Sequence, residues 1–215
     1  IVVLLDDAVP SGEVMGLKAG RNSQGHRFHA PGNVALVHAG DYTERLREAH
    51  VVADFAERQT LIREQVNRVA QAAGAVPVIS DELLHEVTGL VEWPVALMGS
   101  FDSRFLEVPA EALISSMKSH QKYFHLTDTQ GALLPNFITV ANIESTDPAR
   151  IVEGNERVIR PRLADAAFFY ETDQKTALAA RVDALASVVF QQKLGTLADK
   201  TARLRQLACA LAPAL

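Results

Sequence analysis

The strongest structural signal in this sequence is an amphipathic helical pattern that begins after Asp54 and stops at Gly74. Glu57 follows Asp54 at the spacing of a capping box, in which side chains satisfy free backbone N–H groups of the first turn. Apolar residues recur at helical spacing along one face, and charged or amide side chains fall on the others. The apolar face holds Phe55, Ile62, Val66, Val69 and Ala73. The pattern predicts a helix over residues 55–73.

Further helices are predicted where a capping residue or a proline precedes an apolar pattern of helical period. They are expected from Asp41, from Ser80 to about Val91, from Ala110 to Ser119 behind Pro109, and from Asp147-Pro148 onward. The pattern behind Pro109 places Leu113, Ile114 and Met117 on the inward face.

Short apolar or alternating runs between these helices predict strands. They cover residues 1–5, 13–18, 93–101, 121–128 and 136–144. This succession predicts an α+β fold. We expect a mixed α/β portion over residues 1–145 and a mainly helical region over residues 146–215.

Composition excludes several classes of protein. A 215-residue chain that is 48% hydrophobic and 22% charged has an ordinary globular balance. The net charge of −5 argues against a strong nucleic-acid-binding field over the whole surface, so we expect no DNA partner and any RNA contact to be local. Cys209 is the only cysteine, which excludes an internal disulfide and suits a cytoplasmic protein. No apolar run approaches the ~20 residues of a membrane span, so no membrane partner is expected.

The two ends of the sequence suggest a piece of a longer protein. The opening IVVLLDDAVP has neither a starting methionine nor a basic segment, and the chain stops inside the apolar helical run LACALAPAL. We therefore expect further chain on both sides.

No catalytic centre is predicted from the sequence. The Gly-rich nucleotide loops and the G-x-S-x-G turn of serine hydrolases are absent, and Cys209 stands in an apolar helical pattern. His26 and His29 have a spacing that two metal ligands could use, but no third ligand is recognisable nearby. We therefore expect no metal site and interpret Gly25–Gly32 as a polar loop that packs its aromatic residue.

Aromatic and basic residues alternate in the predicted strand HQKYFH. Alternation would place Tyr123 and His125 on one face of the strand, and Lys122 and Phe124 on the other. Such a surface can stack bases and meet phosphates, whereas the same pattern also fits a core strand with a lysine at its edge. Both interpretations remain open.

Three arginines stand close together in GNERVIRPRLADAAFFYETD, the segment over residues 154–173. Pro161 should bend the predicted helix, because it offers no N–H and its ring clashes with the carbonyl group of Arg157. Guanidinium groups gathered at a bend would suit phosphate, which they grip bidentately. The alternative is a solvated face, with Glu156 paired to Arg160 and Asp165 paired to Arg162.

Five blocks of this sequence closely resemble the β subunit of bacterial heterotetrameric glycyl-tRNA synthetase, in the order of that family. The blocks are LVEWPVALMGSF, FLEVPAEALISSMKSHQKYF, LLPNFITVANIES, GNERVIRPRLADAAFFYETD and VVFQQKLGTLADKTARL. GHRF at residues 25–28 matches a further family motif.

The resemblance implies a fold similar to the editing-type module of the phenylalanyl enzyme's β subunit, followed by helices that lead into a truncated domain. It implies an α subunit that activates glycine with ATP and Mg²⁺, and a β subunit that binds the tRNA for glycine, so this fragment itself would bind no cofactor. We therefore expect a non-catalytic module that positions tRNA and assembles with the α subunit. The alternatives are a purely structural scaffold of the α–β complex, or a hydrolase of mischarged tRNA.

The tRNA-binding residues expected from this resemblance and from local basic clustering are Lys118, Lys122, Arg157, Arg160 and Arg162, with Pro161 and Asp165 in structural roles.

Overall fold

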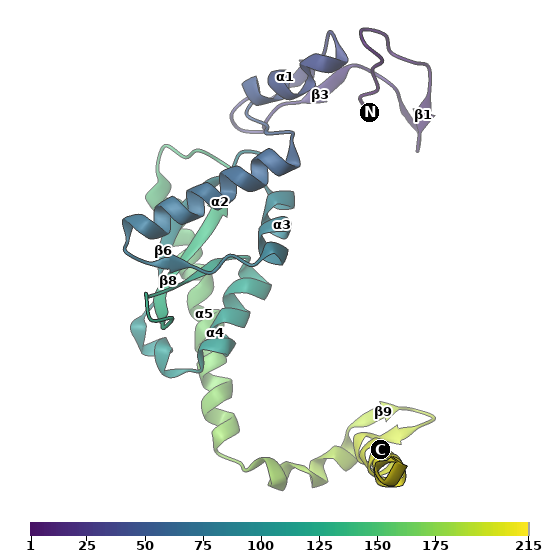
Figure 1. The fold of residues 1–215 in the computed structure, drawn as a ribbon, viewed down its shortest axis with the longest axis vertical. Helices are drawn as coiled ribbons and strands as arrows, with labels where there is room; N and C mark the ends of the chain where they lie inside the picture. The colour runs from purple at the N-terminus through teal and green to yellow at the C-terminus, as the bar shows by residue number, and fades with distance from the viewer. Residues whose placement is uncertain (215) are drawn as a thin grey trace. The chain divides into compact units, whose positions relative to one another are not determined.

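The computed structural model of the protein describes residues 1–214 and has an α+β fold, as predicted (Figure 1). The chain divides into two compact units, one over Ile1–Ala166 and a second from Ala167 onward. This division falls within the helix α5 (Pro148–Gln174), whereas the predicted boundary lies in the loop before that helix. The division into portions over residues 1–145 and 146–215 stays a prediction.

The centre of the first unit is an antiparallel sheet with the strand order β5-β7-β8-β6. Its strands are β5 (Val76–Pro77), β6 (Val95–Ser100), β7 (Phe124–Thr127) and β8 (Leu133–Ala141). β6, β7 and β8 confirm the strands predicted over residues 93–101, 121–128 and 136–144. The turn between β7 and β8 is closed by Asp128, whose N–H donates to Ala132.

The helices α2 (Phe55–Ala72) and α3 (Asp81–Leu90) pack on one face of this sheet (Figure 1). Asp54 accepts a hydrogen bond from the N–H of Glu57 at 2.8 Å, and Ser80 caps α3 in the same way through Leu83. The two predicted helix starts are therefore confirmed.

The core between these helices and the sheet is apolar. It includes Ile62, Val66, Ala70, Leu84, Val87, Phe124, Leu126 and Ile138. Each fully buried Ile, Val or Leu contributes ~1.5–3 kcal/mol. The buried stripe of α2 is narrower than predicted, because Phe55 and Ala73 are exposed.

The opposite face of the sheet is buried as well. Phe137 lies on this face and stacks on Tyr123, with ring centroids 4.4 Å apart. Gly99 is opposite Phe137 in the β6–β8 register, and a Cβ there would lie 2.5 Å from the ring. Glycine is therefore required for the ring to cross β6.

The helical pattern behind Pro109 forms two pieces. α4 (Ala110–Ser115) continues as a π-helical turn, η3 (Ser116–His120), after a 3-10 segment η2 (Ser103–Glu107). Leu113 and Met117 are buried, as predicted. Pro109 is the residue before the first helical turn rather than within it.

The first fifty residues differ most from the predicted elements. Residues 1–5 make only isolated bridges, and residues 13–18 form a hairpin instead of one strand. The short elements are β1 (Glu13–Val14), β2 (Leu17–Lys18), β3 (Asn22–Gln24), β4 (Asn33–Ala35), η1 (Ala39–Asp41) and α1 (Tyr42–Glu48). Asp41 precedes α1, but its side chain makes no capping hydrogen bond, so the predicted capping box is wrong.

The second unit is largely helical. Its elements are η4 (Leu178–Arg181), η5 (Asp183–Ser187), β9 (Val189–Gln191), β10 (Gly195–Thr196), α6 (Leu197–Leu211) and η6 (Ala212–Ala214). Thr196 and Asp199 form a reciprocal capping box at the start of α6. Among residues 1–214, no helix has the length and apolar character needed to cross a membrane.

Candidate functional site

The first half of α5 is anchored to the central sheet and to the segment before it. Ile159 and Leu163 are fully buried. The hydroxyl of Tyr123 donates to Asn155 Oδ1 at 2.6 Å, while the Asn155 amino group donates to the carbonyl of Ile151. These contacts fix the rotation of α5 and therefore which of its side chains reach solvent.

Pro161 is exposed, and α5 runs through it without a break. At ~100° per residue, Arg157 and Arg160 lie about 60° apart around the helix, whereas Arg162 is about 140° from Arg157. The structure therefore brings Arg157 and Arg160 to one face and leaves Arg162 on another. Asp165 is exposed on the same helix.

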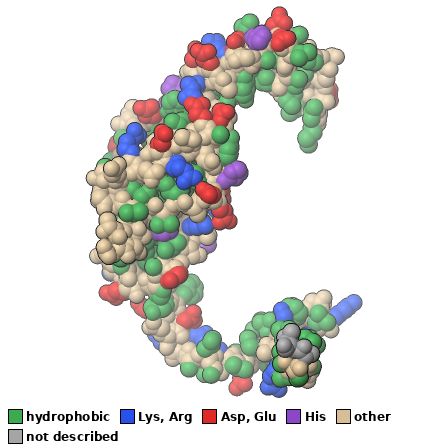
Figure 2. All heavy atoms as spheres, in the orientation of Figure 1, with side chains coloured by type: hydrophobic (Ala, Val, Ile, Leu, Met, Phe, Trp, Pro, Cys, Tyr) green, Lys and Arg blue, Asp and Glu red, His purple; other side chains and the backbone are tan. Residues whose placement is uncertain are grey.

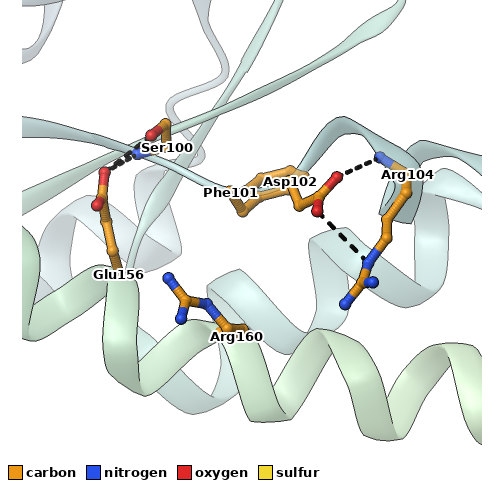
Figure 3. Close-up of a pocket in the computed structure, with 6 residues that line it drawn as sticks. All are labelled: Ser100, Phe101, Asp102, Arg104, Glu156 and Arg160. Carbon is orange, nitrogen blue, oxygen red and sulfur yellow. Dashed lines mark hydrogen bonds and ion pairs between the residues drawn. The ribbon is translucent and has the colours of Figure 1, made fainter.

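Arg160 lines a pocket where β6 ends against α5 (Figure 3). The pocket has a volume of about 530 Å³ and is lined by Ser100, Phe101, Asp102, Arg104, Glu156 and Arg160. The Ser100 backbone N–H and hydroxyl both donate to Glu156 Oε1 at 2.8 Å. Because Ser100 ends the edge strand β6, this carboxylate caps the strand and joins it to α5.

An acidic–basic pair lines the other side of the pocket. Asp102 Oδ1 accepts the backbone N–H of Arg104 at 3.0 Å, and Arg104 Nε lies 3.6 Å from Asp102 Oδ2. The Arg104 guanidinium also lies over the Phe105 ring, 4.9 Å from its centroid. Asp102 and Arg104 thus satisfy each other, whereas Figure 3 shows Arg160 extending from α5 with no bond to the other labelled residues.

Three arginines of α5 have no partner within residues 1–214. No ion pair or hydrogen bond within that range involves the guanidinium groups of Arg157, Arg160 or Arg162, and all three residues are exposed. The predicted pairs between Glu156 and Arg160 and between Arg162 and Asp165 are not formed. On the face drawn in Figure 2, basic and acidic side chains are interspersed.

The two predicted lysines, in contrast, are paired with α3. Lys118 Nζ lies 3.0 Å from Glu82 Oε2, and Lys122 Nζ lies 2.7 Å from Glu86 Oε1. The hydrogen bond from Lys118, and then its charge, hold the pKa of Glu82 below its usual value. These pairs tie η3 and the residues that follow it to α3, and they partly neutralise both lysines.

The second half of the segment HQKYFH is part of the core. Tyr123, Phe124, His125 and Leu126 are all buried, so the interpretation of this strand as a base-stacking surface is wrong. Burial raises the pKa of Tyr123 to about 12. Burial, and then the charge of Lys118, lower the pKa of His125. Lys122 lies at the start of this buried segment with a left-handed backbone, φ 60°.

The rings of His26 and His29 both accept hydrogen bonds from backbone N–H groups. No cluster of three or more His, Cys, Asp or Glu side chains suited to a metal occurs in the part of the chain that the structure describes. His26 is fully buried, and its Nδ1 accepts the backbone N–H groups of Phe28 and His29 at 3.2 Å. The loop is held by these contacts, but its aromatic residue Phe28 is exposed, so the predicted packing of that residue is wrong.

Sequence reasoning missed most of the pocket in Figure 3. Ser100, Asp102, Arg104 and Glu156 line it, but only Arg160 was expected at a binding site. The available signal was the position of Ser100 and Asp102 at the end of a predicted strand. The contact of Ser100 with Glu156 on α5 joins residues 56 positions apart and cannot be predicted from local pattern.

Comparison with known proteins gives one consistent family. The family model described as "Glycyl-tRNA synthetase beta subunit" matches residues 1–215. Proteins named "Glycine--tRNA ligase beta subunit" are similar to this chain in Chromohalobacter salexigens, with 62% identity over 96% of the chain, and in Hahella chejuensis, with 54% over 99%. The protein of that name in Acinetobacter baylyi is 53% identical over 99% of the chain.

The chain spans less than a third of these relatives' length, 30% in Chromohalobacter salexigens and 31% in the other two. The match nevertheless covers every element described above, and it agrees with the resemblance of the five sequence blocks. The chain belongs to the glycyl-tRNA synthetase β subunit family.

Proposed function

We propose that this chain is the tRNA-positioning part of a glycine–tRNA ligase β subunit, and that it works in the cytoplasm together with an α subunit. Its relatives carry the name of that ligase subunit. In this proposal the α subunit activates glycine with ATP and Mg²⁺, and this segment contributes contacts to the tRNA backbone rather than catalytic groups.

The observation that carries the proposal is the set of unpaired guanidinium groups on α5. Arg157 and Arg160 share one face of a helix whose rotation is fixed by the buried Ile159 and Leu163. Arginine binds phosphate through two parallel hydrogen bonds, and this geometry requires guanidinium donors that no carboxylate occupies. Lys118 and Lys122 contribute less in this proposal, because Glu82 and Glu86 already engage them.

A second candidate function is a scaffold for the α–β complex. It is favoured by the exposed aromatic side chains of Phe168 and Phe169 in the last turns of α5. Exposed aromatic residues are enriched at protein–protein interfaces. In this case the arginines would meet carboxylates of a partner protein instead of phosphates.

Hydrolysis of mischarged tRNA has less support. Ser100 is the only hydroxyl side chain lining the pocket at Arg160, and it donates to Glu156 with no histidine among the lining residues. A deacylation assay on mischarged tRNA with the complete α–β complex tests this alternative directly. Turnover that is lost in Ser100→Ala would favour hydrolysis over positioning.

The test of the proposal is the salt dependence of tRNA binding to the complete α–β complex. The triple variant Arg157→Ala, Arg160→Ala, Arg162→Ala removes the unpaired cations from α5. The slope of log K against log salt is negative, and each lost phosphate contact reduces its magnitude by ~0.7–0.9. We therefore expect the magnitude to fall by about 2 in the triple variant, with weaker binding at low salt. Arg150→Ala is the matched control, because Arg150 is an exposed arginine of the same helix already paired with Asp147 at 3.1 Å.

An unchanged slope and affinity in a folded triple variant would contradict the proposal. A triple variant that binds tRNA normally but dissociates from the α subunit would favour the scaffold.

A further inference from the structure

A second groove lies in the first unit, between the loop at Gly25–Gly32 and the end of α3. It has a volume of about 680 Å³, and its lining includes Arg27, Phe28, Tyr42, Arg58, Leu90 and Asn142. None of the residues expected at a tRNA site belongs to this groove. Its position, lining and chemistry therefore require their own explanation.

The loop that carries Arg27 and Phe28 is held in one shape by buried contacts. His26 Nε2 hydrogen-bonds the carbonyl of Asn142 at 2.7 Å, and its Nδ1 accepts from the two N–H groups that follow Arg27. Gly25 lies so close to Ala30 that a Cβ would overlap the Ala30 carbonyl oxygen. The Gly25 N–H donates to Gly32 across the loop at 3.1 Å.

This rigid support presents an apolar aromatic side chain to solvent. Phe28 is 68% exposed, although its backbone N–H and that of His29 both donate to the buried His26. Tyr42 and Leu90 also line the groove and are exposed. The loop contacts thus hold Phe28 at the groove. Because its ring is mostly exposed, it does not serve to fill the core.

The charge of the groove is positive on balance. Arg27 makes no ion pair or hydrogen bond through its side chain within residues 1–214, and it is exposed. Arg58 donates to the backbone carbonyls of Val52 and Thr88, so no carboxylate neutralises it. Glu92 is the one acidic residue in the lining, against these two arginines.

An exposed aromatic ring beside an unpaired guanidinium is the combination that binds unpaired nucleotides. A base stacks on the ring, and the phosphate next to it pairs with the cation. A hydrophobic peptide would use the ring but would leave Arg27 without a partner, and an acidic peptide would lack a planar group for Phe28. The Asn142 amino group also makes no hydrogen bond within the described residues, which leaves a donor for a base carbonyl.

We propose that this groove binds one unpaired nucleotide of an RNA, with its base on Phe28 and its phosphate at Arg27. The inference deepens the proposed function, since it takes tRNA as the RNA, but it concerns a site separate from α5.

The experiment compares tRNA binding by the complete α–β complex in Phe28→Ala, Phe28→Tyr and Arg27→Ala variants over a range of salt concentrations. Loss of one stacked base should weaken binding by roughly 5- to 150-fold in Phe28→Ala and leave the salt slope unchanged, because no counterion is released by stacking. Phe28→Tyr keeps a stacking ring and should bind as the parent does. Arg27→Ala should weaken binding and reduce the magnitude of the salt slope by about 0.7.

Phe190→Ala is the matched control, because it removes an exposed phenylalanine outside the groove and should leave affinity unchanged. Circular dichroism of each variant checks folding, which the loss of an exposed ring should not disturb.

An affinity for tRNA that is the same in Phe28→Ala and in the parent overturns this inference. A Phe28→Ala complex that loses α–β association while the assembled fraction binds tRNA normally also overturns it, because the groove would then be a protein-docking surface. The α5 triple variant, titrated in parallel, keeps the two proposals distinguishable. Weakening by Phe28→Ala alone would support the groove and contradict the α5 contacts, and weakening by the triple variant alone would do the reverse.

Discussion

His26 and Asn142, which are 116 positions apart, are joined by a 2.7 Å hydrogen bond from His26 Nε2 to the Asn142 backbone carbonyl. Asn142 follows β8, and its side-chain Oδ1 accepts the N–H groups of Glu92 and Trp93 before β6. The N-terminal loop, β6 and β8 therefore meet at one asparagine. This junction positions the groove at Phe28 relative to the central sheet.

His26→Ala should lower the free energy of unfolding by ~1–3 kcal/mol, because it leaves buried backbone groups of the loop without partners. The measurement is urea unfolding of the full-length chain, with hydrogen exchange at the N–H groups of Phe28 and His29 as a local probe. His120→Ala removes an exposed histidine and serves as the control. Equal free energies of unfolding for the two variants would show that the hydrogen bonds of His26 do not stabilise the fold.

Gly99→Ala and Gly154→Ala should change stability in opposite directions. A methyl group at residue 99 meets the Phe137 ring and should cost ~1–3 kcal/mol through overpacking. Gly154 lies inside α5 with no atom near the added Cβ, so alanine should stabilise by ~0.4–1 kcal/mol through reduced chain entropy of the unfolded state. Thermal or urea unfolding of both variants decides this. A stabilised Gly99→Ala variant would contradict the packing of Phe137 across β6.

His125 should make the protein less stable in acid. Burial and the charge of Lys118 lower its pKa in the folded state below the ordinary value of 6.5. As the pH falls through that value, the unfolded state binds a proton that the folded state does not, so the free energy of unfolding decreases. His125→Gln should flatten this dependence between pH 7 and pH 5, whereas His120→Gln should retain it. Urea unfolding across that pH range tests the prediction, and identical profiles for both variants would refute it.

Local sequence pattern was sufficient to predict the helices and strands whose capping residues and apolar positions are close together in the sequence. Asp54 and Ser80 start α2 and α3, and the apolar runs form β6, β7 and β8. Their amphipathic or apolar patterns extend far enough to specify each element and the face that it buries. The α+β fold follows from this succession.

The same pattern failed where long-range partners decide the structure. Lys118 and Lys122 are basic residues in a mixed segment, but their carboxylate partners Glu82 and Glu86 lie 36 positions earlier on α3. On each face of the segment, one aromatic residue (Tyr123 or Phe124) is next to a polar residue two positions away, which suggested an exposed surface. Both faces of β7 are covered, so this pattern did not indicate exposure. The first fifty residues form short hairpins with few local signals, and contacts such as His26 to Asn142 determine their shape.

The contact of α5 with tRNA is the central claim, and site-specific photocrosslinking tests it most directly. A benzophenone amino acid is placed at residue 157 or 160 of the β subunit in the complete α–β complex, with residue 64 on the exposed side of α2 as the control position. Irradiation with bound tRNA should give protein–RNA products at residues 157 and 160, and none at residue 64. Crosslinks from residues 157 and 160 to the α subunit alone, with tRNA bound and unmodified, would contradict the account.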